Sequence, residues 1–177
     1  MKYRKILALA VLLSASACQR PYPPAPAQAT NAEQAVGTPA NGAPARVKET
    51  TATFTTPDGA TSSFRLEIAE TMEERLRGLM HRREMARDRG MLFLFPIEEE
   101  RVFYMKNTYI PLDMVFLSSS RKVVSIVENA RPLTLDDRSS GVPARYVIEL
   151  NAFVARDKRI VPGTAVSFEP QPPDVTD

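Results

Sequence analysis

The chain has few of the residues on which disulfide, metal and triad chemistry depend: its 177 residues include one cysteine, one histidine and no tryptophan. Cys18 has no second cysteine with which to pair, so no intramolecular disulfide forms and the hydrophobic core must hold the fold. With His81 as the only histidine and no Gly-x-Ser-x-Gly segment, the Ser/His/Asp and Cys/His mechanisms lack parts. No recognisable zinc-ligand spacing is present, and we expect neither a metal nor a cofactor.

The chain also lacks a large charge excess of either sign. It has 23 Lys and Arg against 21 Asp and Glu, a formal net charge of +2. Lys2, Arg4 and Lys5 lie in a segment that we expect to be removed on export, which leaves 20 basic against 21 acidic residues and a net charge of −1. A chain without a basic excess is a poor match for the phosphate backbone, so we expect no nucleic-acid partner.

Residues 1–17 have the three parts of a signal peptide. A basic start precedes an uncharged apolar run at residues 6–13, which is too short to span a bilayer stably. Small residues then lead directly into Cys18, a pattern that resembles a bacterial lipobox. We therefore predict a signal peptide at 1–17 and a lipidated Cys18 that anchors the chain to a membrane. The alternative is ordinary secretion, which would leave Cys18 as a free thiol.

The predicted anchor sets the location of the chain. We expect an exported protein of the bacterial cell envelope that faces the periplasm. Gln19 follows the cysteine where an Asp would be a retention signal, and this resembles lipoproteins sorted to the outer membrane. Residues 19–46 hold six of the 15 prolines and little to bury. The sequence thus predicts a lipidated Cys and disordered linker at 18–46, one folded domain at 47–170 and a disordered tail at 171–177.

Within the folded domain, the apolar pattern is that of short strands. Residues 52–56 and 62–68 flank a Pro-Asp-Gly turn, which is typical of a hairpin. Further apolar runs predict strands at 91–95, 102–105, 112–117, 123–127, 146–150 and 165–168. We expect an α+β fold, mainly antiparallel β, in which about eight strands form a compact barrel-like sheet.

One main helix is predicted at about 71–82. Thr71 is a good N-cap, and Glu74 three residues later completes a capping box. Apolar residues then recur at helical spacing on one face. Gly78 lies inside the segment, where Gly costs about 1 kcal/mol relative to Ala, and a close backbone approach would explain its presence.

The most informative polar block is the bend at 103–113. Lys106, Asn107 and Thr108 lie between two apolar strands, and Asp113 lies inside the second strand between apolar neighbours. An acid in such a place must face solvent, a polar cleft or a partner that compensates its burial. One interpretation is that these groups bind a small polar ligand. The other is that Asn107 and Thr108 cap the turn while Asp113 accepts from backbone donors.

Four more residues are candidates for the same site. Glu149 lies between apolar residues of a later strand, where it is either an exposed rim charge or a second cleft carboxylate. Arg75 and Arg82 are seven residues apart on the predicted helix. They could pair with Asp113 or Glu149, which we favour, or bind an anionic ligand. Tyr104 offers an aromatic surface for stacking.

These residues belong to a series of short motifs that covers nearly the whole folded region. The motifs are Ala69-Glu70-Thr71, Glu74-Arg75, Gly78-Leu79-Met80, Arg82, Gly90-Met91-Leu92-Phe93, Met105-Lys106-Asn107-Thr108, Ile110-Pro111-Leu112-Asp113, Glu149-Leu150 and Gly163. The series resembles that of the domain of unknown function 192 family. Three positions depart from the family pattern. Tyr104 stands in place of the usual Trp, Phe153 stands where a Gly often follows the Glu-Leu strand, and Thr164 stands in place of an Asp after Gly163. The resemblance implies a small, mainly β domain that is often exported, and it implies no activity.

Three functions are compatible with this sequence. The favoured one is an envelope lipoprotein with a non-catalytic module that binds a small ligand, such as a carbohydrate or another polar envelope component. The second is an anchored adaptor or assembly factor that binds another envelope protein. The third is a hydrolase or lyase that uses Asp113 and Glu149 as a carboxylate pair.

Overall fold

A computed structural model describes residues 48–175 of the chain. The predicted signal peptide, the lipidation site Cys18 and the linker at 18–46 lie outside the described residues, as do the last two residues of the predicted tail. The described part forms seven strands and two short helices. They are β1 (Glu49–Thr55), β2 (Thr61–Ala69), α1 (Met72–Arg77), β3 (Arg89–Phe103), β4 (Leu112–Leu117), β5 (Val123–Ala130), β6 (Arg138–Asn151), α2 (Val154–Asp157) and β7 (Ala165–Glu169).

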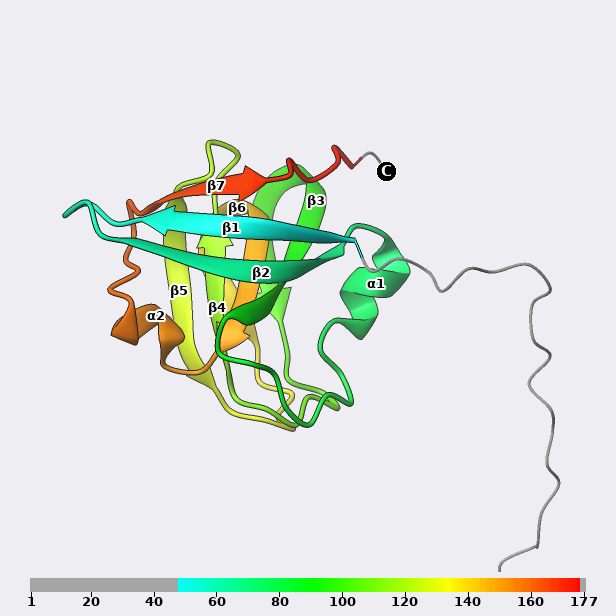
Figure 1. Ribbon diagram of the computed structural model, residues 1–177. Helices are drawn as coiled ribbons and strands as arrows, with labels where there is room; N and C mark the ends of the chain where they lie inside the picture. The colour runs from blue at the N-terminus through cyan, green and yellow to red at the C-terminus, as the bar shows by residue number, and fades with distance from the viewer. Residues whose placement is uncertain (1–47, 176–177) are drawn as a thin grey trace, which may run out of the picture. The chain divides into compact units, whose positions relative to one another are not determined.

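The strands form one curved sheet in the order β5-β4-β6-β3-β2-β1-β7 (Figure 1). All neighbours are antiparallel except β2 and β3, which are parallel and are joined through α1. The two edges of the sheet meet at one end, where Lys122 pairs with Ala165. The sheet is thus a half-barrel, and the predicted α+β, mainly antiparallel, barrel-like class is confirmed.

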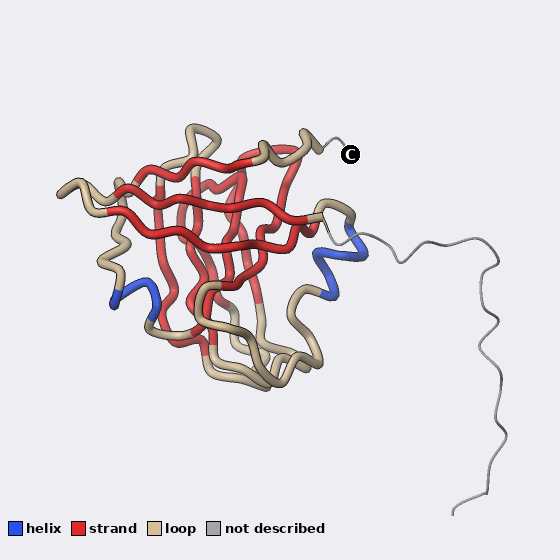
Figure 2. Tube along the Cα trace, in the orientation of Figure 1, coloured by secondary structure: helices blue, strands red, loops and turns tan. Residues whose placement is uncertain are grey.

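The core divides into two clusters because side chains on a strand alternate between the faces of the sheet. In β6, Ile148 and Leu150 belong to the first cluster, which the curved sheet encloses together with α2. Val147 belongs to the second cluster, which lies on the other face and includes Leu79 and Phe93. Glu149 has the parity of Val147 and therefore points to the side of the second cluster. The two helices lie apart from each other (Figure 2).

Gly90 allows β3 to lie close against β6. A Cβ atom at this position would lie 2.4 Å from the carbonyl oxygen of Glu149 and 2.8 Å from methyl carbons of Leu150 and Leu66. No side chain fits these distances, so glycine is required for the close approach of the strands. The backbone position of Glu149 is fixed by this contact.

Helix α1 begins as predicted and ends earlier. The Thr71 hydroxyl accepts from the Glu74 N–H, and the Glu74 carboxylate accepts from the Thr71 N–H, so the capping box is confirmed. The prediction of a helix to residue 82 is wrong, because Gly78 takes a φ of 45° and its N–H closes the last turn on the Glu74 carbonyl. Residues 78–81 form turns.

Other boundaries differ from the prediction for clear reasons. The strands expected at 91–95 and 102–105 are parts of one long strand, β3, whose pairing with β6 shifts register between Leu94 and Glu99. This merger reduces the expected count of about eight strands to seven. The four-residue helix α2 was not predicted. Residues 170–175 have neither helix nor strand, and the disorder of the tail remains a prediction. Within residues 48–175, no helix is long and apolar enough to span a membrane.

Candidate functional site

A pocket of about 400 Å³ lies beside α1, on the face of the sheet that holds the second core cluster. Its walls come from α1 and the turn that follows, from residues 93–103 of β3, and from Tyr104 and Thr108 of the 103–113 bend. Glu149 of β6 also lines it. The volume lies in the range of pockets that hold small molecules. This pocket is the candidate site.

Glu149 is the buried acid of the pocket. Its residue is 4% exposed, and its cross-strand neighbours are Met91 of β3 and Met114 of β4. Among the described residues, none forms a hydrogen bond or an ion pair with its carboxyl group. Burial among apolar groups raises the pKa of Glu149 to about 8. At neutral pH the carboxyl group is therefore mostly protonated and uncharged, and it can donate as well as accept a hydrogen bond.

Two arginines of the pocket wall flank the Phe95 ring. The Arg75 guanidinium lies 5.2 Å from the ring centroid and donates to the carbonyl of Leu94 at 3.0 Å, so the expected pairing of Arg75 with Asp113 or Glu149 is wrong. The Arg101 guanidinium lies 4.0 Å from the same centroid, donates to the Ala144 carbonyl at 3.1 Å and pairs with a carboxylate of β3. Both cations therefore stabilise the wall of the pocket.

The rim of the pocket is apolar and exposed. Five of its large hydrophobic side chains have exposed fractions of 40% or more: Met72, Leu76, Ile97, Val102 and Tyr104. They come from α1, from the β3 bulge, which is the stretch of shifted register at residues 95–102, and from Tyr104 just after β3. A group of exposed apolar side chains around a pocket is a feature of ligand and partner sites.

The structure brings together four of the eight predicted binding residues. Arg75, Tyr104, Thr108 and Glu149 line the pocket. Arg82, Lys106, Asn107 and Asp113 do not. The apolar members of the site, which come from the β3 bulge and the exposed face of α1, were not predicted as site residues. Met72 and Leu76 recur at helical spacing, and the sequence alone does not distinguish an apolar helix face that is buried in the core from one that lines a pocket.

Asp113 is fully buried and has a structural role. Its carboxylate accepts from the backbone N–H groups of Asn129 at 2.9 Å, Phe153 at 3.0 Å and Ala155 at 2.9 Å. The last two donors lie at the start of α2, so Asp113 holds this helix against β4 and β6. The interpretation that Asp113 accepts from backbone donors is confirmed.

Asp113 and Glu149 do not form a carboxylate pair. The register of β4 with β6 places Asp113 opposite Leu150 and Met114 opposite Glu149. Cross-strand partners share a face, and successive residues alternate. The two acids therefore point to opposite faces of the sheet. The hypothesis of a hydrolase or lyase that uses both carboxylates is wrong for this geometry.

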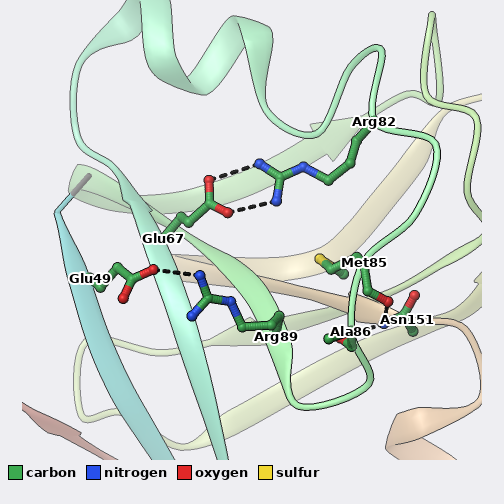
Figure 3. A network of polar contacts seen from close by, with 7 residues as sticks. All are labelled: Glu49, Glu67, Arg82, Met85, Ala86, Arg89 and Asn151. Atoms are coloured by element: carbon green, nitrogen blue, oxygen red, sulfur yellow. Dashed lines mark hydrogen bonds and ion pairs between the residues drawn. The ribbon is translucent and has the colours of Figure 1, made fainter. Parts of the chain in front are cut away.

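Arg82 forms an internal ion pair, but with neither predicted partner. Its guanidinium donates to both carboxylate oxygens of Glu67 at 2.6 and 2.8 Å (Figure 3). These hydrogen bonds lower the pKa of Glu67 and raise that of Arg82. Arg89 pairs with Glu49 nearby, and Asn151 donates to two backbone carbonyls of the same loop. The network ties residues 82–89 to the sheet, and the expected pairing of Arg82 with Asp113 or Glu149 is wrong.

The Lys106–Thr108 turn is held by backbone contacts. Asn107 has a φ of 55°, and its carbonyl accepts from the His81 N–H at 2.8 Å. The Thr108 hydroxyl donates to the Lys106 carbonyl at 3.3 Å, while the Lys106 side chain is exposed. The interpretation of Asn107 and Thr108 as turn residues is confirmed, and Thr108 in addition lines the pocket.

Fold and site together define a small half-barrel domain with one apolar-rimmed pocket above a buried acid. The chain belongs to the DUF192 family, described as Uncharacterized ACR, whose model matches residues 53–168. The resemblance drawn from the sequence motifs is confirmed. No curated protein matches the chain by sequence.

Two solved structures are similar over most of the chain. A protein from Sinorhizobium meliloti 1021, a candidate transcription regulator, is 36% identical with a TM-score of 0.68, and the match covers 70% of this chain and 95% of that one. A protein of unknown function from Novosphingobium aromaticivorans DSM 12444 is 32% identical with a TM-score of 0.66, covering 79% of this chain and 99% of that one. These similarities support the family and the fold, and they assign no activity.

Proposed function

We propose that the chain is a lipid-anchored, non-catalytic binding module of the bacterial cell envelope whose pocket beside α1 takes a small ligand. The observation that supports this most is Glu149, a buried acid without a partner that lines a pocket of about 400 Å³. Buried polar groups in native proteins nearly always have a hydrogen-bond partner. A bound ligand would supply the one that Glu149 lacks.

The lining favours a particular kind of ligand. The exposed rim is apolar, about half of the accessible wall is apolar, and Glu149 is the one deeply buried acid among the lining residues. A ligand with a mainly apolar body and one polar group matches this surface better than a wholly polar ligand such as a carbohydrate. The pocket thus favours an amphipathic ligand over the carbohydrate that the sequence suggested.

The chemistry of the lining supports a non-catalytic role over nucleophilic catalysis. The residues around the pocket include no Ser, Cys, His or Lys, and the Thr108 hydroxyl donates to a backbone carbonyl rather than to a base. A nucleophile activated by a base is therefore not formed by the described lining. The proposed periplasmic location and lipid anchor rest on residues 1–18 alone.

A dye titration tests the binding function. The mature chain with Cys18→Ser, which carries no lipid, should bind Nile red saturably. Leu76→Ser at the rim should weaken binding by about tenfold, because an apolar side chain of this size contributes roughly 1.5 kcal/mol when a ligand covers it. Leu135→Ser is the matched control, since Leu135 is 71% exposed and lies outside the pocket. Equal effects of the two substitutions, or no saturable binding, would contradict the proposal.

The adaptor remains the second candidate, because the same five exposed side chains could be covered by another envelope protein. The two functions differ in what the pocket interior does. Rim substitutions would affect both, whereas Glu149→Leu would affect a small ligand inside the pocket and leave the docking of a protein on the rim intact. Loss of Nile red binding in Glu149→Leu therefore favours the ligand.

A further inference from the structure

We infer, building on the proposed function, that the ligand presents an uncharged hydrogen-bond acceptor, in the first place a carbonyl oxygen, to the buried carboxyl group of Glu149. The apolar body of the ligand then lies between α1 and the β3 bulge. The chemical class is that of hydrophobic ketones, esters and amides. Hydrophobic amines are the class that this arrangement disfavours.

The first observation is the position of the Glu149 side chain. The cross-strand neighbours of Glu149 are Met91 of β3 and Met114 of β4. The β3 backbone at Gly90 lies close against the backbone carbonyl of Glu149. These two methionine side chains supply neither a hydrogen-bond donor nor a positive charge to Glu149. The open direction for its carboxyl group is the pocket, which Glu149 lines.

The second observation is the set of charges around the pocket. Besides Glu149, the titratable side chains that line it are Arg75 and Arg77 of α1, Glu99, Glu100 and Arg101 of β3, and Tyr104. Arg75 donates to backbone carbonyls, Arg101 pairs with Glu99, and Glu100 accepts from the Ser139 hydroxyl. Three arginines against two glutamates leave the surroundings slightly positive. An ammonium group would be repelled there, while the negative end of a carbonyl dipole would be attracted.

The third observation concerns the proton. Because burial raises the pKa of Glu149 to about 8, the carboxyl group holds its proton at neutral pH and offers an O–H donor. A carbonyl oxygen accepts from this donor without any change of charge. An ammonium ligand would first require ionisation of Glu149, which the apolar neighbours oppose.

Three probes with one carbon skeleton separate these cases: benzylacetone, the amine with the same skeleton and butylbenzene. The chain has no tryptophan, so Tyr104→Trp in the Cys18→Ser mature chain places a single emitter at the rim. Benzylacetone should bind about tenfold more tightly than butylbenzene at pH 6, the ratio expected for one buried hydrogen bond. Between pH 6 and pH 9.5 its affinity should fall by up to about tenfold, toward that of butylbenzene, as Glu149 with its pKa of about 8 loses the proton.

Two variants at the same position keep the test decisive, each with its fold verified by circular dichroism. Glu149→Gln retains a donor that does not titrate, so benzylacetone should bind it with an affinity independent of pH. Glu149→Leu has no donor, so benzylacetone should bind it no better than butylbenzene. A pH dependence that survives in Glu149→Gln would assign the titration to another group and overturn the inference.

The other outcomes are distinguishable. Equal affinities for benzylacetone and butylbenzene in the unsubstituted Glu149 chain would overturn the inference while leaving the binding function standing. Preference for the amine, with an affinity that rises with pH, would overturn it in favour of an ion pair. If none of the three probes binds, the proposed function fails together with the inference that builds on it.

Discussion

Two buried acids, one residue apart in cross-strand register, have opposite surroundings. The Asp113 carboxylate accepts three backbone N–H groups, whereas Glu149 has no partner among residues 48–175. Burial without hydrogen bonds stabilises the neutral form of an acid, and this is the case for Glu149. The face of the sheet on which each side chain lies decides whether it meets backbone donors or the pocket. Glu149 is therefore the acid with chemistry to offer, and Asp113 is a structural residue.

The first prediction at this scale concerns stability and pH. Burial raises the pKa of Glu149 from its ordinary 4.5 to about 8 in the folded chain, so the folded chain binds more protons than the unfolded chain between these values. This contribution to the free energy of unfolding is fully present below about pH 4.5 and is lost as the pH rises to about 8. Glu149→Gln does not titrate and should therefore gain stability relative to Glu149 by up to about 5 kcal/mol at pH 9.

Urea unfolding of both chains at pH 5 and pH 9 measures this difference. All other titrating groups are common to the two chains and cancel in the comparison. A stability difference that stays constant between the two pH values would mean that Glu149 ionises normally.

Residue identity could be predicted better than residue role. Glu149, Arg75, Tyr104 and Thr108 were recognised from the sequence as site candidates, and all four line the pocket. The roles were not decided by local pattern, because Asp113 and Glu149 are both acids between apolar strand residues. Which of the two acids lines the pocket depends on the face of the sheet to which its side chain points. The pairing of β4 with β6 sets this face, and that pairing is long-range.

At the scale of elements, boundaries that are set by residues close in sequence could be predicted, and boundaries that depend on distant contacts could not. The start of α1 is set by Thr71 and Glu74, four residues within one turn, and was predicted. Its end depends on Gly78, where a Cβ atom would lie 3.2 Å from the Phe93 ring of β3. Helix α2 depends on Asp113, which is 40 residues distant in sequence from Phe153. Neither contact is visible in a local pattern.

The second prediction concerns the support of α2. Asp113→Asn replaces one acceptor oxygen by an amide NH₂, which then faces a backbone N–H group. Leaving a buried donor unsatisfied costs about 1–3 kcal/mol, so we expect a loss of stability of this size in urea unfolding. Asp137→Asn, at an exposed aspartate, is the control.

The same variant separates α2 from the pocket. Because Asp113 points to the opposite face from Glu149, the affinity for Nile red should stay within about twofold of the unsubstituted chain. A tenfold loss of affinity without a loss of stability would place Asp113 in the binding site and contradict the register.

At the scale of the molecule, the half-barrel explains why one face of the sheet carries the pocket. Curvature encloses the first core cluster between the strands and α2, while the second cluster includes Leu79 from the turn after α1 and Met105 and Ile110 from the 103–113 bend. The six residues of α1 include none that is buried. Because α1 is short, it does not cover this face of the sheet completely. The uncovered part is the pocket, and apolar residues of α1 form part of the rim of the pocket.

The third prediction concerns the anchor, which belongs to the whole chain. If Cys18 is lipidated, the chain should fractionate with membranes, and Cys18→Ser should move it to the soluble periplasmic fraction, because the acyl chains provide the durable attachment. Ala17→Ser, which keeps the cysteine and a small residue before it, is a matched control and should stay with membranes. Equal fractionation of Cys18→Ser and the unsubstituted chain would contradict lipidation.

The ionisation of Glu149 reports the combined effect of α1, β3, β4 and β6 on one carboxyl group. It can be followed by a ¹³C NMR titration of the glutamate side-chain carboxyl carbons, with the Glu149 resonance assigned by its absence in Glu149→Gln. We expect a pKa of about 8 for this resonance in the free chain. A value near 4.5 would show a solvated or paired carboxylate and would contradict a buried, unpaired acid in the pocket.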